Sequence, residues 1–249
     1  MNVIFKKHLP FLLFVSFVFV SCTTKPPQVI YSNYNITRLI KPDSNAINLL
    51  APYHAKLNDN LKEVIGFSAY GLNTKKPESA LGNFMTDAMK TMAEKKFNKK
   101  ITAAFINSGG IRSYIPKGEI TLEKIYELMP FDNLIVLQQL NGIQLKEFLN
   151  HVCDKGGWPV SEGLTYSIKD RKLNEVLVEG ILVSDTANYI IANSDYVANG
   201  GDNTVMLKKI PKENVNYLLR DALIDYAKML TASGKTIDIK INNRITNAK

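Results

Sequence analysis

Cysteine and histidine are scarce in this sequence of 249 residues. Its two cysteines, Cys22 and Cys153, exclude a disulfide framework. Its three histidines, His8, His54 and His151, are too few for a histidine-rich metal site, which is excluded as well. The formal net charge is +8, but no run of five or more basic residues occurs, which argues against nucleic acid as a partner.

The remaining composition is that of an ordinary globular protein. Hydrophobic residues make up 45% of the chain and charged residues 22%, with 14 Gly and 10 Pro. Disorder, collagen and repeat arrays are therefore excluded, and the length allows one large domain or two small ones.

The N-terminus has the pattern of an export signal. Lys6 and Lys7 precede an apolar run, Leu9–Val20, which is too short for a comfortable membrane span. Residues 1–21 are therefore predicted to be a signal peptide. Cys22 follows at once, which is typical of a bacterial lipobox and makes Cys22 the predicted lipidation site. The alternatives are an ordinary signal peptide or an uncleaved anchor. All of these readings predict export, and the lipobox predicts a lipoprotein anchored to a cell-envelope membrane.

After the leader, residues 22–45 read as a lipid-anchored tether and N-terminal extension, and residues 46–249 as the folded domain. Strands and helices alternate irregularly there, which predicts a mixed α/β (α+β) fold. The expected helices cover 46–61 (starting near Pro52), 78–97, 122–129, 145–152 and 215–226. The expected strands cover 29–40, 62–70, 101–106, 134–140, 164–168, 175–183, 189–192 and 237–241.

Four segments have compositions that suit binding better than packing, although each also has a plain structural explanation. Asn107–Arg112 combines a glycine pair with side chains that can donate hydrogen bonds to an anion. The alternative is a simple glycine turn. Pro130–Asn133 places Phe131 on a loop, where it stacks on a ligand or joins the core. Asn193–Asp202 contains an aromatic ring that could stack on a ligand, a glycine pair, and an acid that could accept hydrogen bonds from hydroxyl groups. The alternative is a capped turn in which Asp202 bonds its own backbone. In Lys75–Asn83, Gly82 lies in the first turns of a predicted helix, where glycine is locally unfavourable. Its presence predicts close packing against another element or a ligand.

These segments, in this order, resemble the C-terminal domain of the 5'-nucleotidase family, which also includes UDP-sugar hydrolases and cyclic-nucleotide phosphodiesterases. Gly118–Thr121 and Leu140–Gly142 extend the similarity, which covers about residues 60 to 245. The resemblance implies a mixed sheet flanked by helices and a nucleotide-binding role.

The resemblance also implies a role for each site residue. Phe131 and Tyr196 would sandwich the base, and Asp202 would accept hydrogen bonds from the ribose hydroxyls. The other implied ligand residues are Asn133 and Gly163 near the base, Arg112 and Asn107 on the phosphate and ribose side, and Lys75 at the phosphate, where the family has arginine.

The catalytic half of the family is a metallophosphatase domain with two metal ions, for which this sequence lacks the ligands. No cofactor is therefore expected in this chain, and two divalent metals are expected in a separate metallophosphatase partner. The first hypothesis is a nucleotide-binding domain that acts with that partner on nucleoside monophosphates. The others are a non-enzymatic, lipid-anchored nucleoside or nucleotide binding protein, and a structural relic without a ligand.

Overall fold

The computed structural model describes residues 41–248, without the side chains of residues 52–59. Three predicted features lie outside the described residues: the leader 1–21, the lipidation site Cys22 and the strand 29–40. Between residues 41 and 248, no helix is both long enough and apolar enough to cross a membrane. The chain divides into two units between Leu49 and Leu50, and the sheets all lie in the second unit.

The helix α2 runs from Ser44 to Leu61, so the predicted start near Pro52 is wrong. Asp43 explains the earlier start. Its Oδ1 accepts hydrogen bonds from the backbone N–H of Asn45 at 2.8 Å and of Ala46 at 3.3 Å. These bonds satisfy N–H groups that a helix leaves free at its N-terminus. Pro52 therefore lies inside the helix.

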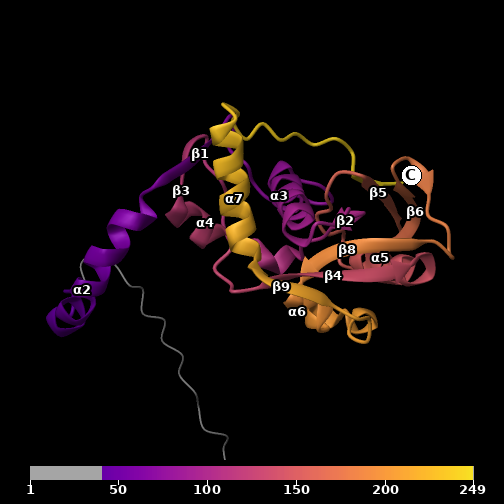
Figure 1. Cartoon of the computed structure of the whole chain (residues 1–249), viewed down its shortest axis with the longest axis horizontal. Helices are drawn as coiled ribbons and strands as arrows, with labels where there is room; N and C mark the ends of the chain where they lie inside the picture. Colours follow the sequence, from indigo (N-terminus) through magenta and orange to yellow (C-terminus); the bar gives the residue numbers. More distant parts are fainter. Residues whose placement is uncertain (1–40, 249) are drawn as a thin grey trace, which may run out of the picture. The chain divides into compact units, whose positions relative to one another are not determined.

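The second unit contains a four-stranded sheet in the order β2-β8-β4-β9 (Figure 1). Its strands are β2 (Ala103–Ala104), β4 (Leu134–Asn141), β8 (Asn188–Ser194) and β9 (Glu213–Leu218). β2 runs parallel to β8, whereas β4 is antiparallel to both of its neighbours. Successive side chains of a strand point to opposite faces. Ile191 and Ala192 of β8 accordingly enter two different hydrophobic clusters, one on each face of the sheet.

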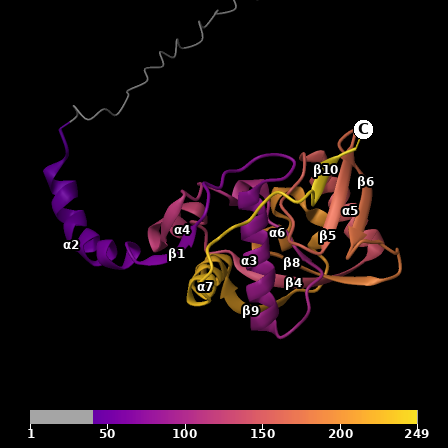
Figure 2. The same cartoon turned by 90° about the horizontal axis from the view of Figure 1, so that it is seen from above.

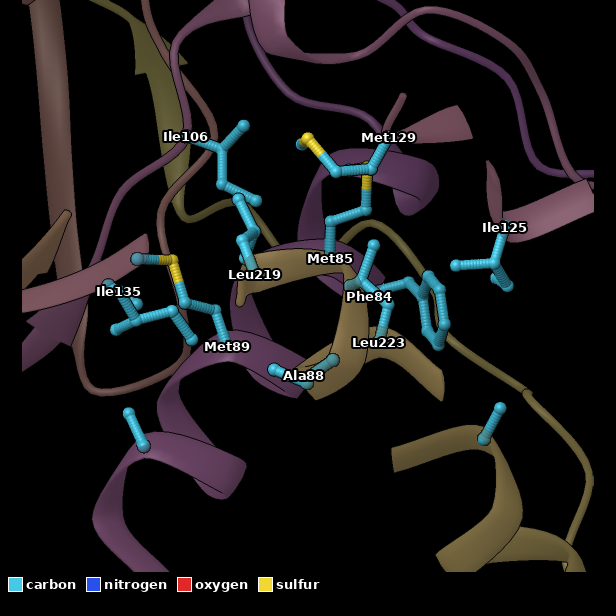
Figure 3. Close-up of a cluster of buried hydrophobic side chains, with 14 of the residues drawn as sticks. Phe84, Met85, Ala88, Met89, Ile106, Ile125, Met129, Ile135, Leu219 and Leu223 are labelled. Atoms are coloured by element: carbon cyan, nitrogen blue, oxygen red, sulfur yellow. The ribbon is translucent and has the colours of Figure 1, made fainter. Parts of the chain in front are cut away.

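The helices α3 (Ala80–Phe97) and α7 (Leu219–Ala232) cover one face of this sheet. Figure 3 shows the cluster between them, to which α4 (Leu122–Leu128) and the sheet also contribute. Its labelled members are Phe84, Met85, Ala88, Met89, Ile106, Ile125, Met129, Ile135, Leu219 and Leu223. Burying each of the larger side chains stabilises the fold by about 1.5–3 kcal/mol. The helix predicted over residues 78–97 is therefore confirmed, and one of its sides packs into this cluster.

The helix α5 (Gly142–Asp154) packs on the other face and also against a second sheet, in the order β10-β5-β6-β7 (Figure 2). The strands of this sheet are β5 (Leu164–Lys169), β6 (Lys172–Val178), β7 (Ile181–Leu182) and β10 (Ile245–Asn247). α5 begins with a capping box, in which the Asn141 side chain accepts from the Gln144 N–H and the Gln144 side chain accepts from the Asn141 N–H. The predicted mixed α/β fold, with sheets flanked by helices, is confirmed.

A small antiparallel pair, β1 (Val64–Ser68) and β3 (Gly118–Thr121), precedes α4. Thr121 caps α4, because its Oγ1 accepts from the backbone N–H of Lys124 at 3.4 Å. Cys153 is buried, and burial raises the pKa of its thiol to about 12. The thiol therefore stays protonated near neutral pH.

Two predicted elements near the C-terminus are wrong. Val215 and Leu218 were expected in the last helix but belong to β9, because hydrogen bonding along the edge of β4 outweighs their helical spacing. The segment 237–241 is not a strand. Ile237 forms one isolated bridge to Ser68, and the chain pairs again only at β10.

Two further predicted strands are only partly strand. The expected strand 175–183 is broken at Gly180, whose φ of 77° turns the chain from β6 into β7. Of the expected strand 101–106, only Ala103 and Ala104 join the sheet. Beyond them, Phe105 forms an isolated bridge to Val160.

Candidate functional site

The two aromatic loops meet because β4 and β8 are antiparallel neighbours. The register pairs Ile135 with Ser194, so the loop before β4 and the loop after β8 emerge at the same end of the sheet. Asp195 ties them together. Its Oδ1 accepts hydrogen bonds from the backbone N–H of Leu134 at 3.1 Å and of Tyr196 at 2.9 Å. One carboxylate oxygen thus links the Phe131 loop to the Tyr196 loop.

These loops form a cavity of about 290 Å³, close to the lower limit for small-molecule sites. Five of the predicted ligand residues line it together with Gly109 and Gly110: Asn107, Phe131, Asn133, Tyr196 and Asp202. Phe131 is 38% exposed and Tyr196 47% exposed, although apolar rings of this size are usually buried. Both rings therefore present open surface at the same cavity.

Because residue 201 is a glycine, the Tyr196 ring can pack against the backbone at this position. A Cβ added to Gly201 would lie 2.4 Å from Cε1 of Tyr196. The ring therefore packs directly on the backbone of Gly201, which accounts for one glycine of the pair. Gly200 has a φ of 93°, and this left-handed conformation accounts for the other.

Asp202 is held by the groups around it and does not bond its own backbone, so the capped-turn alternative is wrong. Its Oδ2 accepts from Asn107 Nδ2 at 2.6 Å and its Oδ1 from the Tyr196 hydroxyl at 3.0 Å. A carboxylate has about four lone-pair positions. Because the protein uses one position on each oxygen, the carboxylate can still accept hydrogen bonds from a ligand.

The Asn107–Arg112 loop separates two cavities. Its Ser108–Gly110 part forms a 3-10 turn. Asn107, Gly109 and Gly110 line the aromatic cavity, whereas Ser108 and Ile111 line a second cavity of about 320 Å³. The other residues around the second cavity are Thr74, Lys75, Lys76, Pro77, Ser79, Gly157 and Pro159. Lys75 therefore lies across the loop from the two rings.

Arg112 lies beside the aromatic cavity rather than in its lining. Its guanidinium carbon is 5.9 Å from the centroid of the Phe131 ring, a cation–π arrangement. Arg112 is exposed, so its fork of N–H donors remains open to an anion.

The structure places Gly163 elsewhere, which corrects its predicted place near the base. Gly163 lines a different cavity with Lys90 and Glu179, among others. Its φ is 100°, and an added Cβ would lie 2.9 Å from Oε1 of Glu179. The positive φ accounts for the glycine here, and Gly163 is not part of the aromatic cavity.

The segment Lys75–Asn83 packs against other elements, as expected. A Cβ on Gly82 would lie 2.6 Å from Cγ of Pro159. Asn83 Nδ2 donates to Glu78 Oε1 at 2.7 Å and to the Lys240 carbonyl at 3.1 Å. This part of the segment therefore joins α3 to the 157–160 loop and to the chain leading into β10.

Three residues shape the site through contacts that no pattern in the sequence indicated: Asp195, His151 and Arg220. Arg220, only 8% exposed, donates to the Phe131 carbonyl at 3.3 Å and to Asp132 Oδ1 at 2.7 Å. His151 lies near the end of α5, and its Nε2 is 2.8 Å from the Asp202 carbonyl oxygen. These partners are 51 to 89 residues apart in the sequence, so no local pattern could have predicted them.

The residues present do not fit the two-metal centre that the resemblance implies for a full enzyme. Between residues 41 and 248, no group of three or more His, Cys, Asp or Glu side chains is placed to hold a metal ion. His151 already bonds a backbone carbonyl, and the side chain of His54 lies outside the described residues.

Sequence comparisons identify the family of this domain. A family model described as 5'-nucleotidase, C-terminal domain, matches residues 58–209. The chain is 28% identical over 217 residues to the trifunctional nucleotide phosphoesterase protein YfkN of Bacillus subtilis, covering 79% of this chain and 14% of YfkN. It is 26% identical over 200 residues to a 5'-nucleotidase of Vibrio cholerae, covering 76% of this chain and 35% of that protein. The chain thus spans about a third or less of the length of these relatives.

Solved structures share the fold. The 5'-nucleotidase precursor from Thermus thermophilus superposes with a TM-score of 0.72 at 26% identity, over 82% of this chain and 43% of that one. The NAD nucleotidase NadN of Haemophilus influenzae has the same fold, with a TM-score of 0.61 at 18% identity, over 83% of this chain and 42% of that one. Since the family model covers more than half of the sequence, the chain belongs to the 5'-nucleotidase family, of which it contains the C-terminal domain.

Proposed function

We propose that this domain binds a nucleoside monophosphate through the cavity that Phe131, Tyr196 and Asp202 line together. The base stacks on the two rings and the ribose hydroxyls donate to the Asp202 carboxylate. Asn107 and Asn133 offer amide groups at the same cavity. The phosphate is directed toward Arg112 and Lys75, the cations of the adjoining loop and cavity. The shared cavity is the single observation that carries this proposal.

Calorimetry on the full-length chain with AMP, GMP, UMP and CMP tests it. Stacking contributes about 1–3 kcal/mol per base by alanine substitution. The double variant Phe131→Ala, Tyr196→Ala should therefore lose affinity by at least about thirtyfold. Tyr70→Ala is the control, because Tyr70 is similarly exposed and lies outside the cavity lining. Equal binding by the double variant and by wild type would refute the proposal.

The hydrolytic reaction, on this proposal, requires a separate metallophosphatase that brings both metal ions. The absence of metal-ligand clusters in the sequence supports a division of labour of this kind. Phosphate release from AMP by a candidate exported phosphatase with Mn²⁺ should rise when this chain is added. The Phe131→Ala, Tyr196→Ala variant should give no such rise. A rise of equal size with both would place the stimulation outside the aromatic cavity.

A non-enzymatic nucleoside-binding role is the second candidate. The separation of the Lys75 cavity from the aromatic cavity favours it, since a ligand without phosphate could satisfy the aromatic cavity alone. Equal affinities for adenosine and AMP would support this role, whereas tighter binding of AMP supports the nucleotide.

We also propose that the protein is exported and anchored to a cell-envelope membrane through a lipid on Cys22, with residues 22–45 as its tether and the domain beginning at residue 46. The lipobox pattern before Cys22 supports this. Wild type should incorporate labelled palmitate and sediment with membranes, and Cys22→Ser should do neither. Membrane association of Cys22→Ser would indicate an uncleaved N-terminal anchor.

A further inference from the structure

Asp202 has a backbone conformation that its neighbours must maintain. Its φ of 52° and ψ of 29° lie in the left-handed region, which is uncommon for a residue with a Cβ. Asp202 also follows the glycines 200 and 201, which are flexible in isolation. Something other than the loop itself must therefore fix the direction of the carboxylate.

The Tyr196 hydroxyl contacts Asp202 twice. It donates to Oδ1 at 3.0 Å and accepts from the Asp202 backbone N–H at 3.2 Å. The main chain and the carboxylate of Asp202 are thus both hydrogen-bonded to the hydroxyl oxygen of Tyr196. The ring of the same tyrosine lines the cavity. Tyr196 therefore combines a stacking surface with a group that orients Asp202.

His151 contacts the carbonyl group of Asp202, which belongs to the next peptide unit along the chain. Its Nε2 donates to the Asp202 carbonyl at 2.8 Å, so Nε2 carries the hydrogen. The imidazole lies on α5 and packs edge-on to Trp158, with the ring centroids 6.1 Å apart. Trp158 belongs to the buried cluster under the second sheet, which makes α5 a rigid support for the histidine.

We infer that His151 and the Tyr196 hydroxyl are positioning residues that hold the Asp202 carboxylate toward the vicinal hydroxyls of a bound ribose. This inference rests on the proposed function, since it concerns the same cavity. Each contact acts through Asp202 and not on the base. Removing either contact therefore weakens recognition of the sugar hydroxyls and leaves stacking intact.

The test compares a ribonucleoside with its 2',3'-dideoxy analogue, which has the same base but neither hydroxyl. Calorimetry on the full-length chain measures adenosine and 2',3'-dideoxyadenosine. A hydrogen bond is worth about 0.5–1.5 kcal/mol, so Tyr196→Phe should lose about two- to tenfold affinity for adenosine. Its affinity for dideoxyadenosine should not change. Tyr189→Phe is the matched control, because the Tyr189 hydroxyl only accepts from the Ser184 N–H outside the cavity lining.

His151→Ala should lose adenosine affinity by a similar factor, and His151→Gln, which keeps an N–H donor, should restore part of it. Unchanged dideoxyadenosine binding shows that these variants still fold and keep the cavity. If wild type binds both nucleosides but the variants bind adenosine as tightly as wild type, or more tightly, the positioning role is refuted and the proposed function stands. If wild type binds neither nucleoside nor any nucleoside monophosphate, the positioning role and the proposed function are both refuted.

Discussion

Single residues beside the cavity set the positions of the aromatic rings, and Gly201 is the clearest case. Its missing Cβ lets the Tyr196 ring rest on the backbone, which fixes where the ring faces the cavity. Asp195 similarly bonds both aromatic loops through one oxygen. At this scale, the spacing between the rings depends on small residues and on backbone contacts beside them.

Gly201→Ala should therefore displace the Tyr196 ring and lower nucleotide affinity about tenfold, which is the worth of one weakened stacking contact. The new Cβ cannot stay 2.4 Å from a ring carbon, so the ring must move. Calorimetry with the tightest-binding nucleoside monophosphate measures the effect. Gly71→Ala is the control, since its Cβ would lie 3.9 Å from the nearest atom and outside the cavity lining. Wild-type affinity in Gly201→Ala would show that the ring position is unimportant.

Among the elements, α3 joins segments that lie far apart in the sequence. Glu78 and Asn83 bind the chain before β10, because Glu78 Oε1 accepts from the Asn242 N–H at 3.1 Å and Asn83 donates to the Lys240 carbonyl. Asp87 adds an ion pair to Arg244, with N–O distances of 2.6 and 2.8 Å. These bonds hold an extended segment that has little strand pairing of its own.

Asp87→Asn should lower the free energy of unfolding by about 3–5 kcal/mol, because it leaves the Arg244 charge buried without a counter-charge. The Arg244 side chain is only 5% exposed and that of Asp87 13%. Urea denaturation measures the change. Asp185→Asn is the matched control: its pair with Lys146 has side chains 59% and 38% exposed and should contribute about 1 kcal/mol or less. Similar losses in both variants would contradict the importance of burial.

For the whole molecule, the pairing of β4 with β8 brings the site together. It joins the loop before Leu134 to the loop after Ser194, and β2, parallel to β8, brings Asn107 to the same end. The site is therefore assembled from three sheet strands and the support of α5, and no group of three or more His, Cys, Asp or Glu side chains among residues 41–248 is placed to hold a metal ion.

Nucleotide binding by the full-length chain should accordingly be unchanged in EDTA. Calorimetry with and without EDTA, at a concentration about tenfold above that of the protein, measures this. The two AMP affinities should agree within about twofold, a free-energy difference of about 0.4 kcal/mol. Hydrolysis by the chain with its proposed partner is the control, because EDTA should abolish it. Loss of AMP binding in EDTA would mean that a metal ion takes part in the binding step.

The sequence by itself determined the fold class and the apolar faces of α3 and α5, because these follow from the order and periodicity of its elements, whereas five cavity residues were indicated by the resemblance of short motifs to the 5'-nucleotidase family. It did not determine β9, the break at Gly180 or the place of Gly163, because strand pairing and side-chain crowding decide them. Only the tertiary structure decided that His151, Arg220 and Asp195 support the site. Their partners come from distant parts of the chain, and a hydrogen bond between such residues forms only once the sheet has brought them together.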